Sequence, residues 1–272
     1  MGNLRITDND LILYRYLFEQ DFLTREHIKN WVWKDLSNSH IDNRLARLTK
    51  EGYLKKHPDL SAGMGTVLMA GSKAVGLLNN DYIIERMMDL KSSFINKESF
   101  IRSYTERDSL NYARYSHDEY LTDIRFKLEG LVDEFLSYRL LMVYNKNAGK
   151  DKKFTKPTPD AIMRRKNDVF AIELENTLKE SWRYQQNIFE GYRNNHREKI
   201  EFVLYICTSQ SIAEGINKEI NKFTSPNMLP NPRLLVVEYD KVMKAKNKFI
   251  AMNYRELGNK IDVKDKVTFN FR

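Results

Sequence analysis

Cysteine is almost absent from this sequence, because its 272 residues include only Cys207. One cysteine cannot form a disulfide within the chain, which excludes a disulfide-stabilised secreted fold and favours a reducing compartment. Cys207 lies in the apolar run FVLYICTS, where we expect it to be a small core residue.

Long hydrophobic runs are also missing. No apolar run approaches the roughly 18 residues that a membrane-spanning helix needs. The opening residues, MGNLRITDND, lack the apolar stretch of a signal peptide. We therefore expect a globular, cytoplasmic protein with no membrane partner.

Several common catalytic motifs do not occur. The sequence has neither the phosphate-binding pattern GxxxxGK[S/T] nor the GxSxG pattern of serine hydrolases. Its five histidines do not follow metal-ligand spacing. A tyrosine-dependent nicking enzyme would need a tyrosine near a histidine cluster, and no such cluster accompanies the 15 tyrosines.

The chain does contain enough apolar material for a core, together with an excess of positive charge. Hydrophobic residues make up 42% of the chain and aromatic residues 12%, and the formal net charge is +8. The length is sufficient for two domains. The charge favours a polyanionic partner.

Residues 1–80 have the pattern of three helices followed by two strands. The first helix is expected to be capped by Thr7 or Asp8, the second by Thr24, and the third to end at Gly52. The segment YLKKHPDLSAGMGTVLMA then indicates strand, turn and strand, and SKAVGLL a short helix. This order predicts a winged helix-turn-helix DNA-binding domain.

The third helix, expected at 38–51, has the two faces of a DNA-reading helix. Ile41, Leu45 and Leu48 form an apolar seam, and polar side chains occupy the opposite face. Basic side chains can bind phosphates, and Asn43 can pair with an adenine edge. The alternative is a scaffold that uses the same surface for protein contacts. The candidate DNA-binding residues are Ser39, His40, Asn43, Arg44, Arg47, Lys50, Lys55 and Lys56.

Residues 81–116 are charged, with apolar residues at helical spacing, and are expected to form a helical connector or a dimerisation arm. Residues 117–272 predict an α/β domain with a central mixed sheet. KVMKAKNK, at 241–248, is expected to be a solvated edge. The expected elements are a helix at 117–132, strands at 135–144, 159–165 and 169–175, a helix at 179–195, a strand at 202–209, a helix at 211–223 and a last strand at 233–240.

Three carboxylates mark the centre of this domain. Strand alternation in VFAIELE places Glu173 and Glu175 on one face, and Asp160 begins the preceding strand, where a hairpin can bring it near Glu173. Converging carboxylates repel one another, so they require a divalent cation, shared protons or basic neighbours. A basic stretch lies beside them, either as a solvated loop or as a second nucleic-acid contact. Its residues are Lys152, Lys153, Arg164, Arg165 and Lys166.

The stretch PTPDAIM…VFAIELE resembles the PD-(D/E)xK nuclease core, whose order of helices and strands also matches the expected one. This resemblance implies Mg²⁺ ligands at Asp160 and Glu173 and a catalytic lysine two positions later. Glu175 occupies that position, and a carboxylate cannot supply the positive charge. Lys179 or Arg183 are the candidates to replace it. The departure favours a degenerate nuclease fold without enzymatic activity.

Most of the chain also resembles the replication-relaxation family of plasmids and other mobile elements, through RLARLTKEGYL at 44–54 and PDA…IELENT at 159–177. That resemblance implies a DNA-binding protein acting in replication control, DNA relaxation or transcriptional regulation, with replication or mobilisation proteins as further partners. We expect sequence-specific binding to double-stranded DNA, by a homodimer, with no cofactor. The alternative is a Mg²⁺-dependent nuclease.

Overall fold

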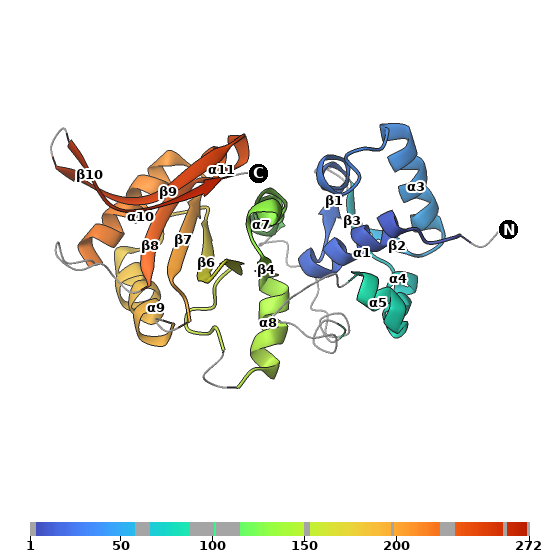
Figure 1. The fold of residues 1–272 in the computed structure, drawn as a ribbon, viewed down its shortest axis with the longest axis horizontal. Helices are drawn as coiled ribbons and strands as arrows, with labels where there is room; N and C mark the ends of the chain where they lie inside the picture. Colours follow the sequence, from blue (N-terminus) through green and yellow to red (C-terminus); the bar gives the residue numbers. More distant parts are fainter. Residues whose placement is uncertain are drawn as a thin grey trace. The chain divides into compact units, whose positions relative to one another are not determined.

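The computed structural model has mixed α and β structure and divides into two compact units, residues 1–122 and 123–272 (Figure 1). The first unit contains a three-stranded sheet and the second a seven-stranded mixed sheet. The structure describes residues 4–57, 66–87, 101, 115–149, 153–196, 199–223, 232–257 and 260–270.

The first helix of unit 1, α1 (Asp8–Gln20), begins as the sequence predicts. Thr7 is its N-cap: its backbone N–H donates to the Asp10 carboxylate over 2.7 Å, and its side chain accepts from the Asp10 backbone. The expected apolar face is buried in full, at Leu13, Tyr14, Leu17 and Phe18.

Two helical segments follow, and their ends also match the sequence pattern. Thr24 caps α2 (Arg25–His27), which continues as a π-helix, η1 (Ile28–Val32). Ile41, Leu45 and Leu48 of α3 (Asn38–Lys50) are buried as predicted.

Helix α3 ends in a tight turn at Gly52. The Tyr53 N–H donates to the Leu48 carbonyl (2.9 Å) and the Gly52 N–H to the Thr49 carbonyl (3.1 Å). This pair of bonds requires a left-handed residue, and Gly52 has φ +81°.

The predicted pair of strands is present as an antiparallel ladder of β2 (Leu54–Lys56) and β3 (Val67–Ala70). Most of the segment that joins them lies outside the described residues. A further strand, β1 (Leu23–Thr24), pairs with the other edge of β3 and was not predicted, because two residues carry no periodicity. The remaining elements are α4 (Ser72–Gly76), η3 (Leu77–Asn79) and α5 (Asp81–Met87).

The connector expected at 81–116 falls largely outside the described residues. Its first part, α5, packs against α1. Helix α7 (Tyr115–Leu128) begins at its other end, runs from unit 1 into unit 2, and confirms the helix expected from residue 117.

In unit 2, the sheet has the strand order β10-β9-β8-β7-β6-β5-β4 (Figure 1). Strands β6, β7 and β8 are parallel, and the other neighbours are antiparallel. The strands are β4 (Glu134–Ser137), β5 (Ala161–Arg165), β6 (Asp168–Glu175), β7 (Phe202–Cys207), β8 (Arg233–Glu238), β9 (Lys248–Leu257) and β10 (Lys260–Asn270). The helices are η5 (Glu129–Leu131), α8 (Tyr138–Asn147), η7 (Arg183–Phe189), α9 (Glu190–Asn195), α10 (Gln210–Phe223) and α11 (Tyr239–Lys244).

Three expectations for this unit were wrong in detail. The run FLSYRLLMVY is not one strand, because it changes at Ser137 from β4 to α8. The strand at 233–240 is not the last one, because β9 and β10 follow it and pair with each other. KVMKAKNK, expected to be a solvated edge, spans the end of α11 and the first residue of β9, and its four lysines are exposed. The helix expected at 179–195 contains the π-helical segment η7 before α9.

Strand β6 separates two chemically different layers. On one face, Phe170 stacks on Phe202 (centroids 4.6 Å apart) and contacts Phe269 of β10 (5.6 Å). On the other face, Tyr192 of α9 donates to Glu173, and Tyr184 of η7 lies near Glu175. Helices η7 and α10 also pack together, with Phe189 against Phe223. The predicted alternation of apolar and acidic residues is therefore confirmed.

Candidate nucleic-acid interface

The outward face of α3 presents the polar side chains that its sequence pattern predicts. Five of the candidate DNA-binding residues on this helix are exposed, as are the last two residues of β2. The exposed residues are Ser39, His40, Asn43, Arg47, Lys50, Lys55 and Lys56.

The acidic charge on this face is neutralised internally. Arg25 clamps the exposed Asp42 carboxylate with two bonds, Nε to Oδ1 at 2.7 Å and Nη2 to Oδ2 at 2.9 Å. The hydrogen bond from Arg25 holds the pKa of Asp42 below its ordinary value. Within the described residues, the four basic side chains Arg47, Lys50, Lys55 and Lys56 have no acidic partner. The face therefore keeps positive charge that is available to an anion.

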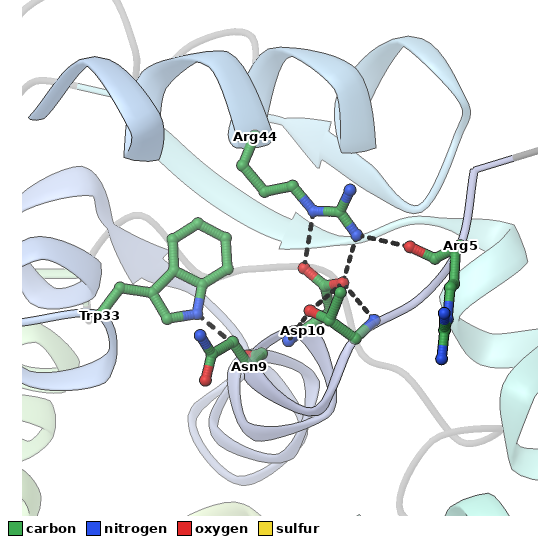
Figure 2. A network of polar contacts seen from close by, with 6 residues as sticks. Arg5, Asn9, Asp10, Trp33 and Arg44 are labelled. Carbon is green, nitrogen blue, oxygen red and sulfur yellow. Dashed lines mark hydrogen bonds and ion pairs between the residues drawn. The ribbon is translucent and has the colours of Figure 1, made fainter. Parts of the chain in front are cut away.

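Arg44 is placed differently from the other candidates (Figure 2). Its Nε donates to Asp10 Oδ1 (3.0 Å), and its Nη2 donates to Asp10 Oδ2 and to the Arg5 carbonyl (2.8 Å). Asp10 is fully buried, and this hydrogen bond raises the pKa of Arg44. Arg44 thus fastens α3 to the start of α1.

A second bond holds the same end of α1. Trp33, which follows η1, donates its indole N–H to the Asn9 carbonyl over 3.0 Å (Figure 2). Trp33, before α3, and Arg44, within α3, therefore both bind the first turn of α1. These two contacts fix the orientation of the exposed face of α3.

The second basic stretch is mostly occupied by structural contacts. Arg164 forms an ion pair with Glu134. Arg165 donates to the Thr268 carbonyl (3.0 Å) and lies over the Phe269 ring. Lys166 is exposed at the β5–β6 turn, Lys153 is half-buried, and Lys152 lies outside the described residues. Only Lys166 of the described members presents an exposed charge.

The three carboxylates each accept a bond from the protein. Asp160 Oδ2 accepts from the Leu174 N–H (2.9 Å), Glu173 from the Tyr192 hydroxyl, and Glu175 from the Lys179 ammonium. Burial, followed by the nearby charge of Asp160, raises the pKa of Glu173 well above its ordinary value. The Lys179 ammonium beside Glu175 and the greater proton affinity of Glu173 both reduce the repulsion that the sequence led us to expect.

This arrangement does not fit a Mg²⁺ site. Among the residues that the structure describes, no group of three or more His, Cys, Asp or Glu side chains is arranged to hold a metal ion. Oxygen ligands for a cation need free lone pairs directed at one point. Here Lys179 binds both oxygens of Glu175, and Tyr192 occupies an oxygen of Glu173.

Sequence patterns gave no sign of several of these partners. The capping pattern T-x-x-D shows Asp10 next to Thr7, but its pairing with Arg44 spans 34 positions. Tyr192 lies on α9 and reaches Glu173 only because the β6–β7 connection folds back over the sheet. Lys179 was one of two candidates, and the contacts place it, not Arg183, on Glu175.

Comparisons with protein-family models, curated proteins and solved structures found no match to this chain. No helix in the described part of the chain is both long enough and apolar enough to cross a membrane.

Proposed function

We propose that this protein binds double-stranded DNA in a sequence-specific manner through the outward face of α3 and the adjoining strand β2. In this proposal, α1, α2 with η1, α3 and the β2–β3 pair form a winged helix-turn-helix, and α3 enters the major groove. The observation that carries it is the set of four cations on this face that have no acidic partner among the described residues, beside an Asp42 already held by Arg25.

The cations have the roles that DNA recognition needs. Phosphate contacts by basic side chains supply much of the affinity for DNA. Exposed Asn43 and His40, on the same face as Arg47, offer hydrogen bonds to base edges. The Arg44–Asp10 pair supports the proposal indirectly, because a reading helix must be held at a fixed angle.

The biological role follows from the resemblance to replication-relaxation proteins. We propose replication control, DNA relaxation or transcriptional regulation on a plasmid or phage-like element, in the cytoplasm, by a homodimer on a palindromic site. The α/β unit would contact a second DNA segment or a replication or mobilisation protein. Its order of helix, three strands, helix and strand supports a degenerate PD-(D/E)xK core, with α8 inserted after the first strand.

A Mg²⁺-dependent nuclease is the alternative that the resemblance implies. The gathering of Asp160, Glu173 and Glu175 with Lys179 favours it, but the bonds already made to these carboxylates do not. Incubation with supercoiled plasmid and Mg²⁺ or Mn²⁺ tests it. Cleavage that disappears in Asp160→Asn would support the nuclease, and we expect no cleavage.

Fluorescence anisotropy with a labelled duplex tests the DNA-binding proposal. Arg47→Ala and Lys56→Ala should weaken binding, and Lys218→Ala, which removes an exposed cation from α10, should not. Equal affinities of wild type and both α3–β2 variants would remove the proposal.

A further inference from the structure

A groove at the start of η7 combines an exposed aromatic ring with a cation that no described acidic side chain binds. It has a volume of about 700 Å³ and is lined by Thr177, Leu178, Lys179, Glu180, Trp182, Arg183 and Asn187. This volume falls within the roughly 300–1,000 Å³ of small-ligand pockets. The groove follows the carboxyl end of β6, and ligands commonly bind at the carboxyl ends of parallel strands such as β6 and β7.

Two large apolar side chains in this groove are only half covered. Trp182 is 51% exposed and Leu178 is 49% exposed. The Trp182 indole N–H donates to the Glu180 carboxylate, so the ring is held by its edge and its single polar group is satisfied. Its faces are left for stacking, which is how aromatic side chains bind unpaired nucleobases.

The walls of the groove are fixed before any ligand binds. Leu178 packs so closely on α10 that a Cβ at Gly215 would lie 2.6 Å from its Cδ1. Ser181 donates to the Glu219 carboxylate (2.5 Å), and Gln185 donates to the Glu219 carbonyl (2.8 Å). Preorganised walls reduce the ordering cost of binding.

The charges of the groove fit an anion. Arg183 is exposed and has no acidic partner among the described residues. Glu180 accepts the Trp182 indole N–H and keeps its negative charge, whereas Glu175 is paired with Lys179. Arg183 is therefore the cation of this groove that no acidic side chain among the described residues binds, and an anionic group can pair with it.

A second groove extends the same surface. It is about 590 Å³ in volume, shares Asn187 with the first, and adds the exposed amides Gln186, Asn194 and Asn195. It also contains the exposed cation Lys156, whereas its carboxylate, Glu190, is paired with Arg193 (3.3 Å). Amides can donate to and accept from base edges. A ligand with repeating bases and phosphates matches this succession better than a single small molecule.

We propose that these two adjoining grooves bind an unpaired segment of a nucleic-acid strand, with a base stacked on Trp182 and backbone phosphates at Arg183 and Lys156. This site belongs to the second compact unit and does not depend on the duplex contact proposed for α3. A second copy of the chain is the other occupant that the exposed apolar side chains could accept, and the experiment separates the two.

The test is anisotropy of a fluorescent oligothymidylate of roughly ten nucleotides, within the ~4–16 that one compact binding module covers. The full-length chain carries Arg47→Ala throughout, which reduces any contribution from α3. Trp182→Ala should weaken binding about 5- to 150-fold, the effect of losing one stacked base. Arg183→Ala should weaken binding and lower its salt dependence. Tyr82→Ala, which removes an exposed aromatic in the first unit, should leave binding unchanged.

Trp182→Phe provides a readout that does not depend on a drastic substitution. It should bind the strand within about threefold of its parent, because phenylalanine also stacks. The quenching of tryptophan fluorescence by the strand should be lost in this variant. A parent protein that does not bind the strand, or Trp182→Ala binding as tightly as its parent, would overturn the proposal. Concentration-dependent self-association that Trp182→Ala abolishes, without strand binding, would assign the groove to a second copy and also overturn it.

Discussion

Arg44 of α3 lies against Asp10 of α1, with its Nε 3.0 Å from Oδ1, and so joins two helices whose residues are 34 positions apart. Asp10 also accepts the Thr7 N–H and thereby completes the capping box of α1. The buried Asp10 carboxylate therefore both stabilises the start of α1 and holds α3 against it. Arg44, a candidate DNA-binding residue, thus holds in place the helix that carries most of the other candidates.

Removing this ion pair should destabilise the first unit. Arg44→Ala leaves a buried carboxylate without its partner, which costs about 3–5 kcal/mol of unfolding free energy. Asp10→Ala together with Arg44→Ala should cost less than the sum of the single changes. Urea unfolding measures these values. Arg47→Ala, on the exposed face of the same helix, should change stability by less than about 0.5 kcal/mol. A similarly small effect of Arg44→Ala would contradict a structural role.

Gly71 packs against the backbone at the end of α3, where a side chain has no room, and Gly76 is the control position with open space. A Cβ at Gly71 would lie 2.3 Å from the Gly52 carbonyl oxygen, a backbone atom that also accepts the Lys73 N–H. Gly76 has open space within 4 Å. Gly71→Ala should therefore cost about 1–3 kcal/mol, as overpacking does, whereas Gly76→Ala in α4 should be neutral or stabilising. Thermal melts compare them, and equal melting temperatures would exclude the close approach.

Ionisation of Glu173 should lower the free energy of unfolding as the pH rises. Its pKa is raised by burial and by Asp160, so the folded chain holds this proton more tightly than the unfolded chain, where the pKa is about 4.3. The stabilisation is complete below about pH 4.3 and is lost as the pH rises through the raised pKa. Glu173→Gln removes this dependence while keeping an acceptor for the Tyr192 hydroxyl.

Denaturant unfolding at about pH 5 and about pH 8 measures this effect. The stability of Glu173→Gln relative to wild type should rise between the two conditions, whereas Glu214→Gln, an exposed change on α10, should follow wild type. If the stability of wild type and of Glu173→Gln depended on pH in the same way, folding would not raise the pKa of Glu173, and the prediction would be wrong.

The sequence predicted those parts of the fold that local chemistry determines. The caps at Thr7 and Thr24, the end of α3 at Gly52 and the buried Ile41–Leu45–Leu48 seam each depend on neighbours within a few residues. The hairpin of β5 and β6 was equally visible, because two alternating runs flank a short turn.

The errors come from features that short patterns do not resolve. FLSYRLLMVY is apolar enough for either a strand or a helix, and its pattern does not show that the change between them comes at Ser137, the N-cap of α8. Strands β9 and β10 had a signal that was missed, since alternating runs flank Gly258-Asn259 in the sequence. The partners of Arg44, Glu173 and Glu175 depend on the tertiary fold or on the path of a connection, which residue spacing does not give.

The salt dependence of duplex binding tests the central proposal most directly. For B-DNA, each phosphate contact contributes about 0.9 to the slope of log affinity against log salt concentration. Replacing Arg47, Lys50, Lys55 and Lys56 together by alanine should weaken binding and reduce this slope by up to about 3.6. Trp182→Ala should leave the slope for a duplex unchanged. An unchanged affinity and slope in the four-residue variant would show that the exposed face of α3 and β2 is not where this protein binds DNA.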